Sequence, residues 1–180
     1  MRHVICALSL LAGLCSMCYG KNNLTLLVQF QDRHSILSIE AMKAELKSIM
    51  KGVEVDWKLI ADVPDGQSFP DLVVVKFKGV CEMAPIPPYL IDERGPLAFT
   101  HTSDGQVLPF SEVECDKVRQ SISGVVRGND SKRANVLLGR ALGRVLAHEL
   151  HHVLENTRHH EKEGVNQRAL TAAQLISEHL

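Results

Sequence analysis

The sequence predicts an α+β domain: a small twisted mixed β-sheet with a crossover helix, a long helix carrying an H-E-x-x-H motif, and a C-terminal helix. Three observations predict this fold class. Short runs of alternating or β-branched apolar residues indicate strands, while longer segments repeat apolar residues at helical spacing. The order strand–helix–strand at the start requires a right-handed crossover between parallel strands, so the sheet should be partly parallel.

The first segment, residues 1–20, has the layout of a secretory signal peptide. A short basic start at Arg2 is followed by an apolar run and then by small or turn-forming residues that end at Gly20. The apolar run is too short to span a bilayer permanently. We therefore expect cleavage after Gly20 and a protein that is secreted or periplasmic, without stable membrane insertion.

The remaining 21–180 segment predicts a single domain, because the chain of 180 residues is long enough for one hydrophobic core and too short for two. The hydrophobic fraction of 45% is ordinary for a globular protein. The net charge of −1 argues against nucleic acid as a partner. We expect a monomer.

The five cysteines divide between the leader and the mature chain. Cys15 follows a segment that loosely resembles a lipobox, so lipidation is an alternative to simple export, although Leu14 is bulky for such a signal. The mature chain keeps Cys81 and Cys115, which an oxidising compartment should join in a disulfide worth roughly 3–4 kcal/mol. Two buried free thiols are the other interpretation.

The first half of the mature chain predicts three strands and one helix. Alternating or continuous apolar residues define the strands, and the helix begins at one of the polar residues Asp32, Ser35 or Ser38 and stops before Gly52. The predicted strands are residues 24–30, 53–59 and 72–75, the last being buried on both faces, and residues 62–70 form a turn region.

The second half begins with a proline-rich stretch, residues 81–96, that predicts an irregular loop. A short strand at residues 97–102 should lie at a sheet edge, and another short strand includes Val107 and Leu108. A helix is expected from about residues 129–131 to Asn156, and a last helix at residues 166–180.

The segment His148-Glu149-Leu150-His151-His152 gives the long helix its chemistry. His148 and His152 are one helical turn apart and point from one face, so two neutral imidazoles can share a Zn²⁺ at about 2.0–2.1 Å. Glu149 can take a proton from a metal-bound water and return it to a leaving amine. We therefore expect one zinc ion and a catalytic Glu149 on an active-site helix.

A third ligand must come from beyond the helix, because a tetrahedral site needs a different direction of approach. Asn156 is suited to a left-handed helix stop, and two histidines follow the turn. We expect His160 to bind the metal, with His159 as the alternative. Glu155 converges poorly because it continues the same straight helix.

Residues 138–164 resemble the metzincin clan of zinc peptidases, whose pattern is H-E-x-x-H-x-x-G-x-x-H. They also resemble small secreted bacterial proteins in which A-L-G-R-V-L-A-H-E precedes a His-rich turn. The resemblance implies two helical histidine ligands, Glu149 as the base and a third histidine ligand. The sequence departs from the pattern where Asn156 replaces the glycine one residue late, where Arg158 holds the place of the third histidine, and where no methionine follows Gly164.

The expected function is zinc-dependent hydrolysis of a peptide or protein substrate. In the metzincin architecture an extended peptide adds to the exposed sheet edge, which predicts substrate contacts at Leu97, Ala98, Phe99 and Thr100. An ordinary edge strand without a ligand is the plain alternative. Two further hypotheses are a non-catalytic secreted metal- or protein-binding module derived from a peptidase, and a thermolysin-like peptidase in which Glu178 is the third ligand.

Overall fold

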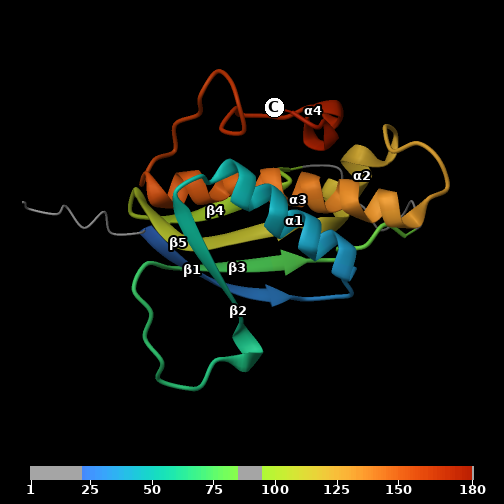
Figure 1. Cartoon of the computed structure of the whole chain (residues 1–180). Coiled ribbons are helices and arrows are strands. Elements are labelled where there is room, and N and C mark those ends of the chain that lie inside the picture. Colours follow the sequence, from blue (N-terminus) through green and yellow to red (C-terminus); the bar gives the residue numbers. More distant parts are fainter. Residues whose placement is uncertain (1–21, 85–94, 180) are drawn as a thin grey trace, which may run out of the picture.

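The computed structural model describes residues 22–84 and 95–179, in which the long helices lie on one face of a single sheet (Figure 1). The predicted signal peptide, the lipobox-like segment and most of the predicted proline-rich loop lie outside the described residues. The mixed α+β fold class is confirmed. No helix of the described part of the chain is long and apolar enough to cross a membrane.

The sheet has five strands in the order β2-β1-β3-β5-β4. The pairs β2–β1, β1–β3 and β3–β5 are parallel, whereas β4 runs antiparallel to β5 at the edge of the sheet. The sheet is therefore mixed, as predicted, with its antiparallel strand at the border. The strands are β1 (Asn22–Phe30), β2 (Val53–Leu59), β3 (Leu72–Lys78), β4 (Ala98–Ser103) and β5 (Gln106–Glu114).

Two long helices cover one face of this sheet. The crossover helix α1 (Ile36–Ile49) begins after Ser35, one of the predicted start residues, and α3 (Ser131–Leu154) begins after Asp130, whose carboxylate accepts two backbone N–H bonds. The shorter elements are η1 (Ile60–Asp62), α2 (Cys115–Ser123) and α4 (Ala172–Ile176). Helix α3 ends close to its predicted position, which places the histidine motif in its last two turns.

Glycines let α1 and α3 approach closely. A Cβ atom added to Gly139 would meet the backbone oxygen of Ser38 and would lie 2.6 Å from the Cβ of Ala41. One added to Gly143 would lie 2.9 Å from the backbone oxygen of Met42. Neither contact is sterically possible, so the absence of side chains at these two positions sets the distance between the helices.

Three of the described elements differ most from the sequence predictions. Strand β5 is longer than the short strand expected at Val107 and Leu108, because it continues through Pro109. Proline has no N–H to donate, but Pro109 lies where the pairing with β4 is irregular, opposite the step from Thr100 to Thr102, so no ladder hydrogen bond is required there. Helix α2 was not predicted. The last helix spans only Ala172–Ile176 rather than residues 166–180.

The predicted disulfide between Cys81 and Cys115 is present, with a Cα–Cα distance of 5.0 Å. Both cysteines are fully buried, and the bond ties the segment after β3 to the first residue of α2. Disulfides of this kind form in oxidising compartments. The structure therefore favours the disulfide over two free thiols.

Candidate metal centre

Two histidines of α3 direct nitrogen atoms at each other. The Nε2 atoms of His148 and His152 are 3.1 Å apart, and the two rings are nearly perpendicular, at 89°. This arrangement follows from their spacing of four residues, which places both imidazoles on one helix face. The two histidines therefore share one face of the helix, as the sequence predicts.

The hydrogen bonds of the other ring nitrogens fix the tautomer that each imidazole adopts when it is neutral. Nδ1 of His148 lies 3.0 Å from the carbonyl oxygen of Val165, and Nδ1 of His152 lies 2.9 Å from that of Thr157. A carbonyl oxygen only accepts, so each Nδ1 carries the hydrogen and each neutral ring keeps a lone pair on Nε2. Two lone pairs facing each other at this distance repel, and a cation between them would remove the conflict.

The end of α3 is built around His152. Asn156 adopts a left-handed φ of 45°, as the sequence predicted for the helix stop. Its N–H donates to the carbonyl of Val153, and the N–H of Thr157 donates to the carbonyl of His152. This is the Schellman pattern of helix ends. Because Thr157 also accepts the Nδ1 hydrogen of His152, the helix stop and the orientation of this imidazole are parts of one local structure.

His160 completes the group. After the turn, its ring lies 5.1 Å from that of His148 and 5.0 Å from that of His152, measured between centroids. One potential ligand atom from each of the three residues lies within 4.8 Å of the others, and we call His148, His152 and His160 the histidine cluster. The cluster could hold a metal ion. His159, the alternative ligand, and Glu178 are exposed and are not part of it.

The electrostatics keep the cluster neutral. Burial lowers the pKa of His148 and of His152, with the hydrogen bonds to the carbonyls acting in the opposite direction. Burial also lowers the pKa of His160, and the positive charge of Arg168 lowers it further. The three imidazoles therefore stay unprotonated at neutral pH, which is the state in which histidine binds metals.

Glu149 is buried beside the cluster, with 5% of its surface exposed. Its Oε2 accepts a 2.7 Å hydrogen bond from the hydroxyl of Thr100 on β4, and that hydroxyl lies 2.9 Å from the hydroxyl of the fully buried Ser111. If Thr100 gives its one hydrogen to the carboxylate, Ser111 donates to Thr100. Burial raises the pKa of Glu149, and the bonds from Thr100 partly offset this effect.

A cleft of about 690 Å³ runs between β4 and the segments that follow α3. The edge strand forms one side of it, and the expected substrate-binding residues Leu97, Ala98, Phe99 and Thr100 all line it. His148, Glu149, His152 and His160 line the same cleft. The structure thus brings the predicted metal ligands, the predicted base and the predicted edge strand to one cavity.

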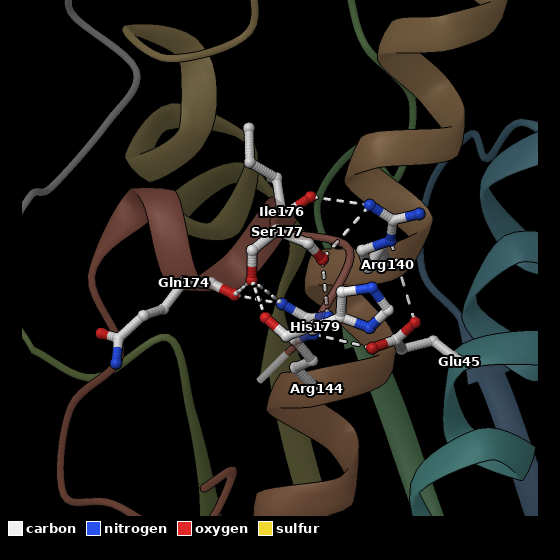
Figure 2. A network of polar contacts seen from close by, with 7 residues as sticks. All are labelled: Glu45, Arg140, Arg144, Gln174, Ile176, Ser177 and His179. Carbon is white, nitrogen blue, oxygen red and sulfur yellow. Dashed lines mark hydrogen bonds and ion pairs between the residues drawn. The ribbon is translucent and has the colours of Figure 1, made fainter.

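Residues 167–170 and Leu175 form another wall of the cleft. Polar contacts fix the C-terminal segment to α3 (Figure 2). Arg144 is 1% exposed, and its Nε donates at 2.7 Å to Glu45 of α1. Its other nitrogens donate to the carbonyls of Gln174 and Ser177 and to the hydroxyl of Ser177. Arg140 donates to the carbonyl of Ile176 at 2.8 Å. These contacts satisfy carbonyls that the end of α4 leaves open.

Several contacts of the candidate site could not be predicted from the sequence. The hydrogen bond from Thr100 to Glu149 joins residues 49 positions apart, and the carbonyl of Val165 that orients His148 carries no side-chain signal. The pair of arginines four residues apart, Arg140 and Arg144, was the one available sign of an anchored segment. Comparisons with protein-family models, with curated proteins and with solved structures found no match to this chain.

Proposed function

We propose that the protein is a secreted zinc-dependent peptidase of metzincin-like type that hydrolyses peptide bonds, with Glu149 as the general base. One observation carries the proposal. Two imidazoles whose Nδ1 hydrogens are committed to backbone carbonyls bring their Nε2 atoms within 3.1 Å of each other, and they line a cleft together with the buried carboxylate of Glu149.

The donor set fits zinc. Three neutral imidazole nitrogens are typical of catalytic zinc sites, which keep a further position open for water or substrate. Hard cations such as Mg²⁺ and Ca²⁺ prefer oxygen ligands, and the cluster offers none. When bound, zinc would supply a Lewis acid that activates a water molecule and polarises the carbonyl under attack.

Proton transfer and substrate alignment would depend on residues of the chain itself. Glu149 lies at the cluster with its carboxylate held by Thr100, so it can accept a proton at Oε1 or Oε2 and return it to the leaving amine. Its raised pKa brings the carboxyl closer to the range in which such exchange is efficient. Strand β4, at the border of the sheet, would align an extended peptide by main-chain hydrogen bonds.

Secretion belongs to the same proposal. The disulfide between Cys81 and Cys115 fits an oxidising compartment, and the leader-like first segment would take the chain there.

The test combines metal analysis with hydrolysis of an unfolded protein substrate. We expect one zinc per chain, loss of zinc in His152→Gln and His160→Gln, and retention in His159→Gln, a matched control for the neighbouring histidine. Glu149→Gln should keep its zinc and lose hydrolysis by about 10²–10⁴-fold. A protein that binds zinc but never hydrolyses substrate would be a binding module, and one that takes up no metal would refute the proposal entirely.

A further inference from the structure

The charged residues that line the cleft are unevenly distributed. Arg158 and Arg168 contribute two permanent positive charges, and among the described lining residues Glu149 is the one carboxylate. That carboxylate is buried and already accepts hydrogen bonds from Thr100. The chain as a whole has a net charge of −1, so the positive character of the cleft is local.

Neither arginine forms an ion pair within the described part of the chain. Within the described residues, no carboxylate oxygen lies within 4.0 Å of a guanidinium nitrogen of Arg158 or Arg168. The positive charge of Arg168 interacts with His160, and this interaction is repulsive when the imidazole is protonated. An anionic group on a ligand would therefore meet two arginines with unused donors.

The wall that carries Arg168 is held in place. It continues into α4, whose end is bound by Arg140 and Arg144, and Arg144 is anchored in turn by Glu45 (Figure 2). At its other end, the carbonyl of Val165 is fixed by His148. A charge that is positioned between two such anchors can select a ligand group instead of only attracting it.

The rest of the cleft suits a peptide better than a small anion. Leu97, Val145, Leu170 and Leu175 give it an apolar portion beside the arginines. An apolar side chain and a carboxylate on one extended chain would satisfy both portions, with the main chain along β4.

We propose that the cleft selects peptides that present a carboxylate to Arg168 and Arg158 near the residue held at the histidine cluster. The carboxylate belongs either to an Asp or Glu side chain or to the C-terminus of the peptide. This inference rests on the proposed peptidase function for its substrate class. It adds the preference for an acidic group.

The test measures binding separately from hydrolysis. N-terminally labelled heptapeptides of Ala and Leu, with an uncharged fluorophore and an amidated C-terminus, carry Asp or Asn at one position at a time, and one peptide without Asp keeps a free C-terminal carboxylate. Their affinities for the zinc-loaded Glu149→Gln protein are measured by fluorescence anisotropy. Arg168→Gln, alone and combined with Arg158→Gln, is introduced in that background, and Arg133→Gln, at an exposed arginine in the first turn of α3, is the matched control.

We expect Asp at one or two adjacent positions to bind about threefold to fivefold tighter than Asn, as is typical of a partly exposed ion pair. The preference should shrink at high ionic strength and disappear in Arg168→Gln but not in Arg133→Gln. A gain confined to the free C-terminal carboxylate would assign the anion to the end of the peptide. Equal affinities for Asp and Asn and no gain from a free carboxylate, a preference that survives loss of both cleft arginines, or no peptide binding would overturn the proposal.

The two proposals fail in different ways. Hydrolysis of neutral and acidic peptides at equal rates would leave the peptidase standing and remove the acidic preference. Selective binding of acidic peptides by a protein that never cleaves them would keep the acidic preference and remove the peptidase function.

Discussion

The anchor between α3 and the C-terminal segment can be tested by Arg144→Met, which keeps an unbranched side chain and removes the guanidinium. Four hydrogen bonds would be lost at once: those to the carboxylate of Glu45, to the carbonyls of Gln174 and Ser177, and to the hydroxyl of Ser177. Arg144 is 1% exposed, so water cannot replace it without local opening.

The size of the expected loss of stability follows from the carboxylate of Glu45, which the substitution leaves without its partner. Removing one partner of a buried ion pair typically costs about 3–5 kcal/mol. The side chain of Glu45 is 18% exposed, and the Nε atom of Arg140 lies 3.8 Å from its other oxygen, so part of its charge stays compensated. We therefore expect the lower end, about 3 kcal/mol, equivalent to a fall in Tm of roughly 6–12 °C for a domain of this size.

The assay is urea unfolding monitored by circular dichroism, with Arg133→Met as the exposed control. A double variant, Arg144→Met with Glu45→Gln, should lose less than the sum of the two single variants, because the second change removes the buried charge that the first one strands. A loss below about 1 kcal/mol in Arg144→Met, or strict additivity in the double variant, would refute the reasoning.

Four further outcomes are expected. Gly139→Ala should destabilise the fold by about 1–3 kcal/mol, because its methyl group would meet the backbone of α1, and urea unfolding would show it; no loss would mean that the helices are free to separate. Asn156→Ala should cost about 1 kcal/mol, because alanine tolerates the φ of 45° poorly, whereas Asn156→Gly should be tolerated in the same assay. Thr100→Val should raise the pKa of Glu149 further by removing a hydrogen bond to the carboxylate, so the acidic limb of the kcat/KM profile should move to higher pH; an unmoved limb would contradict Glu149 as the titrating base. In the metal-free protein, the cluster histidines have pKa values below the ordinary 6.5, so the unfolded chain binds more protons than the folded one and the free energy of unfolding should fall as the pH drops below about 6.5; replacing all three by Gln should flatten this slope.

The elements that sequence could predict are those in which one local pattern decides the structure. The apolar stripe of α3, the β-branched run of β3 and the left-handed stop at Asn156 each follow from neighbouring residues. Helix α2 was missed because it is nine residues long and its buried Val118 and Ile122 supply one apolar repeat. The last helix was overextended because Leu170 and Ile176 continue a helical spacing although the backbone of residues 165–171 takes another path.

The site shows the same division. The placing of His148 and His152 on one helix face could be predicted from their spacing, since a helix fixes which residues share a face. The contacts of Glu149 with Thr100, on another strand, and of His148 with the carbonyl of Val165 depend on the tertiary fold. An arginine such as Arg144 is ordinarily exposed, yet Glu45 and the end of α4 enclose it.

The structure also shows how the three histidines of the cluster come together although the chain departs from the H-E-x-x-H-x-x-G-x-x-H pattern. The groups that orient the two helical imidazoles are the carbonyls of Thr157 and Val165, which every residue type supplies. Asn156 supplies the left-handed turn of a glycine, and its Oδ1 accepts a hydrogen bond from the N–H of Val107 at 3.4 Å, a tie to β5 that glycine lacks. Because backbone carbonyls orient the two helical imidazoles, the constraint falls on the path of the chain after α3, and substitutions that preserve this path should preserve the cluster.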